Sequence, residues 1–545
     1  MNFLGLTIKE TKFILMVSLI LIIVTSSVFI FGYLIRGDLF YNGLHISSPI
    51  DTPVYYANIA QVKEGHGLLD NLFSNEKNAA RLFNIIWLAI GFFAYLFHLT
   101  PVWAYQIARI ILTPVFLFVL YKFINYCLLG YTNYQKKFCF LYSIFASGLG
   151  TFALVLKNFV PSLIDKFSVS MDFWVPEGSN FLILFNSPHF LASLTLIILI
   201  FYCILLCAET KLLRYSLMAG ILALALLSFH PYYALTIFGV PLVYFLVLFI
   251  KNKKIIPSLI YNYLIFGILA MPAILYYVFI YSTNLPFQMK ILQYKSPTPG
   301  FDVFFISYGL GLLCAILAII FIIKKKKLDN IKLFLIIWFL ISILLIYSPV
   351  AYQRRLVEGF QIPLTILAFI GLVAIYNFLK NKSQIIRTLR MYEILPIFVL
   401  LFCFSNAIFY LMDLKYLSFK SDITYTPQAI ITALDWYKNQ TSEKETILSV
   451  PLNGNLIPGL ISRRVFIGHG SETVNYEKKL NQIIWFFKDS QNDEAKKEFI
   501  KDNQIDYLFY SIREKALGQF NPQSKNYLKQ VYDNNGVSIY KVILE

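Results

Sequence analysis

Charged side chains are scarce in this sequence of 545 residues: only 14% are Asp, Glu, Lys or Arg, whereas 58% are hydrophobic. A soluble domain does not have enough interior to bury that much apolar surface. The composition therefore excludes an ordinary soluble protein and predicts an integral membrane protein. Aromatic residues make up 17% of the chain, as expected where rings fill helix interfaces and lie at the depth of lipid headgroups.

Cysteine and histidine are also rare, with six of each. The cysteines lie in or beside apolar segments, so they predict neither a disulfide framework nor a thiolate metal site. The histidines occur singly, without the H-x-x-x-H spacing of two ligands on one helix face, so the sequence does not support a histidine-bound metal. We therefore expect a protein without a metal cofactor.

Acidic residues are outnumbered, because 30 Asp and Glu face 47 Lys and Arg and give a formal net charge of +17. Such a balance can indicate nucleic-acid binding. Here, however, the basic residues form short clusters between hydrophobic segments, at 251–254, 324–327 and 380–390. Loops of this kind follow the positive-inside rule for membrane proteins. The partner predicted by the charge is the lipid bilayer, and not nucleic acid.

Apolar segments long enough to cross about 30 Å of hydrocarbon predict about eleven transmembrane helices. They occur at 13–34, 102–120, 138–156, 191–208, 215–229, 232–250, 256–281, 304–323, 331–347, 362–379 and 394–412. The first has no small-residue cleavage site and predicts an uncleaved anchor.

The shorter segment 82–97, with Asn84 near its start, decides the orientation of everything after it. If it crosses the membrane, the lysine-rich loops face outward. If it lies in the outer interface as an interfacial helix, every lysine-rich loop becomes cytoplasmic, which satisfies the positive-inside rule. We therefore expect a cytoplasmic N-terminus and an extracytoplasmic C-terminus.

After residue 413 the pattern changes from long apolar segments to short alternating ones. An amphipathic stretch at 429–439 is followed by the strand-like "TILSVPL" and "RRVFIGH", the helical "KKLNQIIWFF", and the strand-like "DYLFYS" and "VSIYKVIL". Strands interleaved with helical periods predict an α/β fold. We expect a transmembrane domain at 1–412 and an extracytoplasmic α/β domain at 413–545. The tail has no Gly-rich phosphate loop, no G-x-S-x-G and no zinc spacing, so we expect it to support or recognise and not to catalyse.

The first hydrophilic loop contains "IDTPVYY", which places Asp51 shortly before Pro53 at the start of a predicted helix. A structural interpretation is sufficient here, because an Asp cap, an early Pro and a Gly65 C-cap mark the two ends of a helix. In the functional interpretation Asp51 is a reactive carboxylate. The two are compatible, since a cap holds a carboxylate rigidly and catalysis benefits from rigidity. We expect Asp51 to cap the helix and to point into the site.

Further polar candidates fall on the outer face under the same topology. Each of these residues can also have a purely structural role. Loop carboxylates can be solvated charges, single histidines beside proline are often structural, and arginines near a span can extend to the interface. One arginine lies inside the second span, where an unpaired cation is costly. The candidates are Asp172, Glu177, His189, His230, Arg354 and Arg355 on the outer face and Arg109 in the span.

Carboxylates combined with arginines suit transfer of a group from a phosphate leaving group. A carboxylate takes a proton from the acceptor, while arginines hold the phosphate and stabilise its developing charge. We expect Asp51, Asp172 and Glu177 to be the catalytic candidates. We expect Arg354, Arg355, Arg109, His189 and His230 to bind the carrier phosphate.

The motifs "DTPVYYANIAQVKEGHGLL", "DFWVPEGSNF", "SPHF", "FHPYY" and "RRLVEGFQIP", in this order and layout, resemble the GT-C superfamily of polytopic membrane glycosyltransferases. That superfamily includes the protein O-mannosyltransferases, the lipid A aminoarabinose transferase and uncharacterised prokaryotic relatives. The resemblance covers the whole chain in architecture. It implies a polyprenyl-phosphate-sugar donor, an inverting transfer in a prokaryotic cell envelope, and Asp51 as the acidic residue of the first loop, acting as the base.

The sequence departs from the family at one point: Thr52 follows Asp51, so the first loop has neither a paired acidic motif nor D-x-D. This puts a metal-dependent mechanism of the oligosaccharyltransferase type in doubt, and leaves a substrate-positioning role open for Asp51. Two other functions stay open. A lipid or glycan transporter or flippase usually carries polar residues at mid-membrane and internal repeats, whereas these spans are nearly free of charge apart from Arg109 and no repeat is found between the halves. A non-catalytic scaffold would display the C-terminal domain alone.

Overall fold

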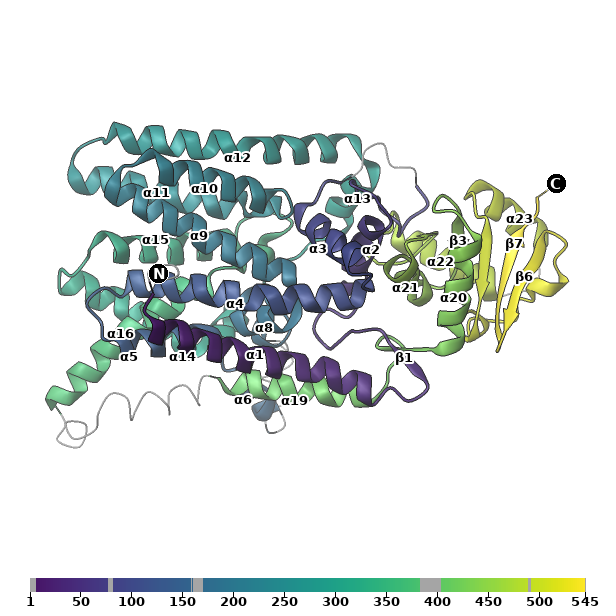
Figure 1. The fold of residues 1–545 in the computed structure, drawn as a ribbon, viewed down its shortest axis with the longest axis horizontal. Helices are drawn as coiled ribbons and strands as arrows, with labels where there is room; N and C mark the ends of the chain where they lie inside the picture. The colour runs from purple at the N-terminus through teal and green to yellow at the C-terminus, as the bar shows by residue number, and fades with distance from the viewer. Residues whose placement is uncertain are drawn as a thin grey trace. The chain divides into compact units, whose positions relative to one another are not determined.

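The chain divides into two compact units in the computed structural model, which describes residues 6–76, 82–157, 159, 170–382, 403–488 and 492–544. Unit 1 comprises Met1–Ser27, Arg109–Tyr276 and Ser296–Asp413, and unit 2 comprises Val28–Ala108, Tyr277–Lys295 and Leu414–Glu545. The division falls within the helices α1 (Ile8–Leu34), α4 (Pro101–Cys127) and α12 (Pro257–Thr283), which are labelled in Figure 1. The predicted domain boundary at 412/413 stays a prediction.

Seven helices are long and apolar enough to cross a membrane, which supports an integral membrane protein. They are α1, α4, α9 (Pro188–Thr210), α11 (Ala234–Asn252) with the turn before it, α12, α14 (Phe301–Lys324) and α16 (Gln361–Lys382). The predicted span 138–156 is a bent pair of helices, α5 (Asn133–Phe145) and α6 (Gly150–Lys157), which meet at 49°. Counted as one span, the pair raises the number to eight among the described residues.

The remaining predicted spans form helices shorter than a full membrane span, or they are only partly described. The segments 215–229 and 331–347 form the short apolar helices α10 (Leu213–Leu227) and α15 (Asn330–Ile346). Most of 394–412 lies outside the described residues, and α19 (Phe404–Ser418) covers its end. The segment 82–97 forms α3 (Ile85–Leu96), which is capped by the Asn84 side chain and at 12 residues is about 18 Å long. This length is too short to cross a bilayer, so the expectation of a short helix is confirmed; its interfacial position stays a prediction.

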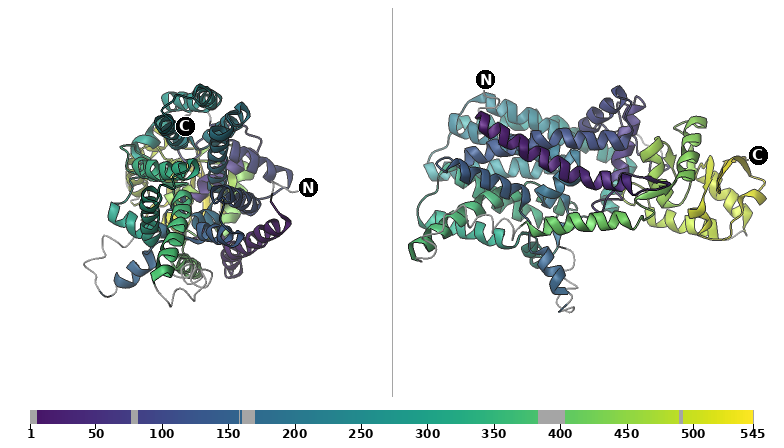
Figure 2. Two further views of the ribbon diagram at one scale, coloured as in Figure 1. Left: turned by 90° about the vertical axis from the view of Figure 1, so that its left-hand side faces the viewer. Right: turned by 60° about the horizontal axis from the view of Figure 1, so that its bottom comes forward.

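The helices of unit 1 run side by side, and the end-on view of Figure 2 shows them gathered into a bundle. Small residues permit the closest approaches: a Cβ atom on Gly371 of α16 would lie 2.2 Å from the Cys314 carbonyl oxygen of α14. Backbones can meet in this way only where the side chain is very small, which is how membrane helices gain packing contacts.

A loop with short helical turns lies between α6 and α9 in unit 1. It contains η2 (Met171–Phe173), η3 (Pro176–Gly178) and α8 (Asn180–Asn186). Gln361, the first residue of α16, accepts from the Asn180 backbone N–H and donates to the Ala146 carbonyl. The Tyr308 hydroxyl of α14 donates to the Gly178 carbonyl at 3.0 Å. These bonds fix the loop that carries Asp172 and Glu177.

Unit 2 contains a five-stranded mixed sheet in the order β4-β3-β5-β7-β6. The strands are β3 (Thr446–Leu448), β4 (Arg464–Val465), β5 (Tyr507–Tyr510), β6 (Leu528–Asn534) and β7 (Val537–Val542). β3 pairs in parallel with β4 and β5, whereas β7 pairs antiparallel with β5 and β6. The helices that pack with this sheet are α20 (Gln428–Gln440), α22 (Tyr476–Lys488) and α23 (Asp493–Asp502).

The C-terminal sheet and its helices confirm the α/β prediction for the tail. The predicted helices at 429–439 and "KKLNQIIWFF" correspond to α20 and α22, and the predicted strands to β3, β4, β5 and β7. The sequence interpretation missed β6, because "LKQVYDN" is polar: most of its residues are partly or fully exposed at the sheet edge. A separate two-stranded pair joins β1 (Leu39–Tyr41) to β2 (Tyr425–Pro427).

The first-loop helix α2 (Thr52–Lys63) lies in unit 2 between α3 and α21 (Pro451–Ile461). A Cβ atom on Gly459 of α21 would lie 2.9 Å from the Pro53 carbonyl oxygen, so glycine is needed where α21 crosses the first turn of α2. The Asn455 amide also donates to the Ile50 carbonyl at 3.0 Å. The start of α2 is therefore held by a helix that is some 400 residues later in the chain.

Candidate functional site

Asp51 precedes α2 but does not cap it, which corrects the prediction of a capping carboxylate. Its backbone has the helical values φ −75° and ψ −31°, and its side chain makes no capping hydrogen bond. A side chain can reach back to the N2 or N3 amide only from the extended backbone of a true cap. The rest of the helix prediction holds, since Pro53 lies in the first turn and Gly65, at φ +100°, follows the last one.

The Asp51 carboxylate instead meets the imidazole of His469, with 3.0 Å between Oδ1 and Nε2. The Asp51 side chain is 50% exposed, whereas that of His469 is only 7% exposed. A buried imidazole is held by its surroundings, so it can fix the orientation of a carboxylate that remains open to solvent.

Hydrogen bonding defines the tautomer of His469. The Ser471 backbone N–H donates to Nδ1 at 3.2 Å, so Nδ1 is an acceptor and has no proton. The proton of the neutral ring must then be on Nε2, where it is donated to Asp51 Oδ1. This arrangement gives one oxygen of the Asp51 carboxylate a fixed hydrogen-bond donor.

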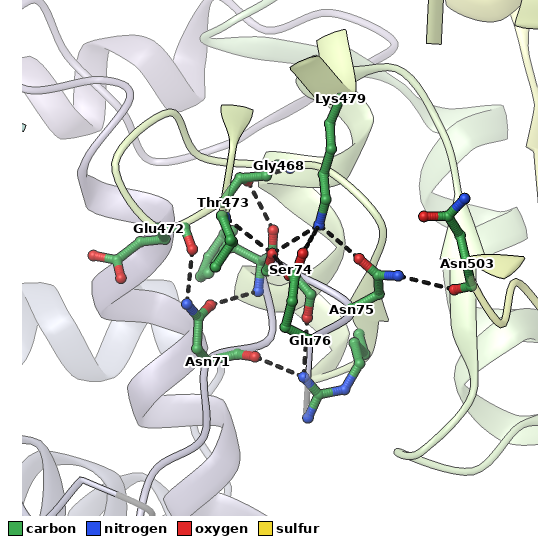
Figure 3. A network of polar contacts seen from close by, with 12 residues as sticks. Asn71, Ser74, Asn75, Glu76, Gly468, Glu472, Thr473, Lys479 and Asn503 are labelled. Atoms are coloured by element: carbon green, nitrogen blue, oxygen red, sulfur yellow. Dashed lines mark hydrogen bonds and ion pairs between the residues drawn. The ribbon is translucent and has the colours of Figure 1, made fainter. Parts of the chain in front are cut away.

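The loop that carries His469 is held on the first loop by a network that we call the clamp, formed by residues 69–76 and 464–479 (Figure 3). The two segments pair through their backbones: the Val465 N–H donates to the Leu72 carbonyl at 2.9 Å, and Ser74 forms a β-bridge with Ile467. The Thr473 hydroxyl donates to the Phe73 carbonyl at 2.8 Å and accepts from the Gly468 N–H at 3.0 Å. These bonds fix the backbone on either side of His469.

Lys479 of α22 is the buried cation of the clamp. Its ammonium lies 2.6 Å from Asn75 Oδ1, 3.0 Å from Ser74 Oγ and 2.8 Å from Glu76 Oε1, as Figure 3 shows. Burial lowers the pKa of Lys479, and Glu76 acts in the opposite direction. A buried charge is tolerated where it is paired and hydrogen-bonded, so this lysine ties α22 to the first loop.

A second ion pair fixes the same loop from another side. Lys290 of α13 (Leu285–Gln293) pairs with Glu472, whose backbone carbonyl also accepts from the Asn71 amide at 2.7 Å. Burial raises the pKa of Glu472, but the Lys290 ammonium outweighs it, so the pKa lies below its ordinary value. The loop around His469 is thus attached to the first loop and to α13, all within unit 2.

Four of the predicted side chains lie in one region of unit 1. The rings of His189 and His230 are 5.3 Å apart, edge to face. Arg355, in η5 (Gln353–Val357), lies 5.6 Å from the centroid of the Tyr232 ring, next to His230. Glu177 of η3 is close enough to raise the pKa of a neighbouring carboxyl, that of Glu358. His189, His230, Arg355 and Glu177 are therefore neighbours in unit 1, and their roles in the site stay predictions.

The charges in this region are strongly shielded from solvent. Glu358 is 0% exposed and accepts from the Ser193 and Tyr233 hydroxyls. Burial, together with the charge of Glu177, raises the pKa of Glu358 well above its ordinary value. Burial lowers the pKa of His230, and His189 and Arg355 lower it further. The region therefore holds a neutral histidine and a carboxyl group that favours its protonated form, next to an arginine.

Arg354 and Arg109 have aromatic or neutral polar neighbours. The Arg354 guanidinium lies 4.5 Å from the centroid of the Trp174 ring, within the range of a cation–π contact. Arg109 is buried in unit 1, where its guanidinium donates to the Thr25 and Ser26 hydroxyls and to the Leu184 carbonyl. These contacts join α4 to α1 and α8, and a phosphate-binding role for either arginine stays a prediction.

Asp172 is buried on η2, which packs against η3 in unit 1. Its Oδ2 accepts from the Gly148 N–H at 3.1 Å, at the break between α5 and α6. Burial raises its pKa, although hydrogen bonds, including that from Gly148, act in the opposite direction. The carboxylate therefore holds the bend of the helix pair, and its catalytic role stays a prediction.

Sequence reasoning missed His469, Glu472 and Lys290. In the sequence, His469 is only the last residue of a strand-like segment, in a tail that lacks known motifs. A usable signal was present, because in α/β sheets functional residues gather after the carboxyl ends of parallel strands, and His469 follows β4 in "RRVFIGHG". Among the described residues no three or more His, Cys, Asp or Glu side chains gather in a metal-binding arrangement, and the expectation that no metal is needed stays a prediction.

Comparison of the whole chain with solved structures shows the same fold in membrane glycosyltransferases. Oligosaccharyltransferase AglB from Archaeoglobus fulgidus, in complex with an inhibitory peptide and a dolichol-phosphate, matches with 11% identity and a TM-score of 0.50, over 98% of this chain and 74% of its own. ArnT from Cupriavidus metallidurans, bound to undecaprenyl phosphate, matches with 10% identity and a TM-score of 0.50 over 98% of both chains. This chain has the GT-C glycosyltransferase fold.

A third GT-C structure, arabinofuranosyltransferase AftD from Mycobacteria, matches over 99% of this chain and 42% of its own, with 10% identity and a TM-score of 0.51. No family model and no curated protein matches the chain. The agreement is therefore one of GT-C architecture at low sequence identity, and it confirms the fold that the sequence resemblance implied.

Proposed function

We propose that this protein transfers a sugar from a polyprenyl-phosphate-linked donor to an acceptor at the extracytoplasmic face of a prokaryotic cell membrane. The observation that carries the proposal is Asp51: a half-exposed carboxylate at the start of the first-loop helix, oriented by a buried neutral histidine. The GT-C fold agrees with it, and two proteins of that fold were solved with a dolichol-phosphate and with undecaprenyl phosphate.

In the proposed reaction Asp51 is the general base. His469 donates to Oδ1 and orients the carboxylate, which takes the proton from the acceptor hydroxyl as the hydroxyl oxygen attacks the anomeric carbon. The bond between that carbon and the phosphate oxygen breaks, and the configuration inverts. His469 is a positioning residue, because it acts on Asp51 and touches neither substrate. Preorganised donors of this kind hold a base in its productive orientation.

The leaving group is polyprenyl phosphate, whose charge rises as the glycosidic bond breaks. Arg354 and Arg355 are the groups that we propose to stabilise it, because a guanidinium presents a planar set of donors that matches two phosphate oxygens. The Arg354 guanidinium lies 4.5 Å from the centroid of the Trp174 ring, and that of Arg355 lies 5.6 Å from the centroid of the Tyr232 ring. These aromatic contacts support both arginines at the loop before α16.

The experiment that tests the proposal measures release of polyprenyl phosphate. Purified full-length protein is reconstituted with polyprenyl-phosphate sugars and a membrane extract that supplies acceptors, and lipid products are identified by mass spectrometry. The proposal predicts polyprenyl phosphate together with an acceptor whose mass rises by one sugar. Movement of intact donor between leaflets without any cleavage would support a flippase instead.

A further inference from the structure

Unit 2 has a cavity of about 360 Å³ that is separate from Asp51. It lies among the end of α1, β1, the start of α4, α20 and the carboxyl end of α2. Because α2 has 12 residues, Asp51 at its beginning and Lys63 at its end are about 18 Å apart. The volume falls within the range of roughly 300–1,000 Å³ typical of small-molecule sites. No step of the proposed transfer uses this cavity.

One wall of the cavity is aromatic. The Tyr33 and Trp103 rings lie 5.7 Å apart and those of Tyr33 and Tyr41 lie 6.0 Å apart. Trp103 is 41% exposed, so its ring is accessible. The β1–β2 ladder pairs Tyr41 with Tyr425 and holds this wall in place. Aromatic rings offer apolar faces to a ligand without losing much conformational freedom on binding.

The opposite wall carries charges of both signs. Lys63 and Glu64 come from the end of α2, and Asp435 and Lys438 from α20. Glu64 Oε1 pairs with the Lys438 ammonium at 2.6 Å. Burial lowers the pKa of Lys63, and the nearby Lys438 lowers it further. The four side chains together carry no formal net charge, while they offer both hydrogen-bond donors and acceptors.

The aromatic rings and the charges of both signs together favour one class of ligand over others. Glu64 is paired on both sides, with Lys438 at 2.6 Å and with the Arg463 guanidinium at 3.6 Å. An anion in the cavity would meet the carboxyl groups of Glu64 and Asp435, and a cation would meet the ammonium groups of Lys63 and Lys438, so a ligand charge of either sign has a like charge in the lining. A polyhydroxylated neutral ring satisfies both, since its hydroxyls can donate to carboxylates and accept from ammonium groups. Its C–H face can lie on the aromatic wall.

We propose that this cavity binds a neutral saccharide, as a glycan subsite about one helix length from Asp51. The inference rests on the proposed function insofar as glycosyl transfer brings glycans to unit 2. The saccharide can belong to an acceptor glycan or to a glycan on the donor, and both present the same hydroxyl and C–H chemistry.

Saturation-transfer NMR tests the subsite directly. The full-length protein is placed in phosphatidylcholine nanodiscs, because alkyl maltoside detergents carry sugar headgroups, and a mixture of glucose, galactose, mannose, N-acetylglucosamine and their disaccharides is added. We expect at least one saccharide to bind, and Trp103→Ala to weaken that binding at least about fivefold through loss of the stacking surface. Tyr95→Ala, which removes an exposed aromatic ring that does not line the cavity, should bind normally.

Two polar variants keep the test independent of the aromatic wall. Lys63→Ala and Asp435→Ala each remove one hydrogen-bonding group from the rim and should also weaken saccharide binding, without disturbing a packed core. Absence of binding by every saccharide in the unmodified protein, or unchanged binding in Trp103→Ala and both rim variants, overturns the proposal. Loss of a copurified phospholipid in these variants, without saccharide binding, assigns the cavity to a lipid headgroup and also overturns it.

Failure of this subsite is distinguishable from failure of the proposed function. Asp51→Asn should lose transfer but keep saccharide binding, since the two positions lie at opposite ends of α2. In the transfer assay Trp103→Ala should keep kcat, and should raise the KM of the acceptor or of the donor according to which carries the saccharide. Normal transfer with no saccharide binding in any form of the protein would contradict the subsite alone.

Discussion

At the scale of single residues, the proposed mechanism depends on how the Asp51 carboxylate is oriented although it does not cap α2. Asp51 has a helical backbone, so its side chain cannot turn back onto the amides of α2, and it extends to His469 instead. A capping bond would direct the carboxylate back to the backbone of α2, whereas the contact with the imidazole directs it to the loop that carries His469. The same two residues thus explain why the cap prediction is wrong and why the carboxylate can still act as a base.

His469→Ala should lower kcat for transfer about tenfold while donor binding stays the same, because removal of an orienting partner typically costs roughly 10–100-fold. His469→Gln should recover part of the loss, since its side-chain amide can still donate an N–H towards Asp51. The measurement is a steady-state transfer assay alongside donor binding to the same variants. Equal loss in both variants, with weakened donor binding, would mean that His469 serves only the fold.

Glu358 allows a prediction about pH. Its pKa in the folded protein is raised above the ordinary value of 4.5, so its contribution to stability is present below that value and is lost as the pH rises through the folded pKa. Glu358→Gln keeps the size and an acceptor but does not titrate. The thermal midpoint of the unmodified protein should therefore fall relative to that of the variant as the pH rises above 4.5.

A matched truncation separates this effect from packing. Glu358→Ala leaves the Ser193 and Tyr233 hydroxyls without their acceptor and should destabilise the protein by about 1–3 kcal/mol. A pH-independent difference between the unmodified protein and Glu358→Gln would show that Glu358 is ionised in the folded state as it is in the unfolded chain.

At the scale of elements, the clamp explains how a tail helix and a first-loop segment become one structure. Lys479→Ala removes the cation that joins Ser74, Asn75 and Glu76. Loss of one partner from a buried pair typically costs about 3–5 kcal/mol, and the partial exposure of Glu76 reduces this. We expect hydrogen exchange at 69–76 to rise by about tenfold or more. Lys478→Ala, an exposed neighbour on the same helix, should leave exchange unchanged.

An element could be predicted from the sequence where the cause of its structure is local. Long apolar periods predicted α1, α4 and α9 because the requirement to span hydrocarbon is encoded locally. The break in 138–156 was not predictable in this way, since the bend is stabilised by Asp172, which bonds to Gly148 from a later loop. The contact of Asp51 with His469 joins residues 418 positions apart, and no local pattern specifies such a pair.

At the scale of the whole molecule, the topology remains the main untested prediction. The lysine clusters at 251–254 and 324–327 lie at or beyond the ends of α11 and α14, as expected for cytoplasmic loops. In a background without the six cysteines, Lys529→Cys in the tail should react with an impermeant maleimide added to intact cells. Lys326→Cys should react only after the cells are permeabilised. The opposite pattern would place the tail in the cytoplasm and reject an extracytoplasmic reaction.

The central claim, that Asp51 is the base of a sugar transfer, is tested most directly by Asp51→Asn. Asparagine keeps the size of the side chain and can still meet His469, but it cannot take a proton. The account predicts that release of polyprenyl phosphate and transfer to acceptor both fall about 10²-fold or more, the usual effect of removing a general base, while donor binding is unchanged. Transfer by Asp51→Asn at a rate near that of the unmodified protein would contradict the account.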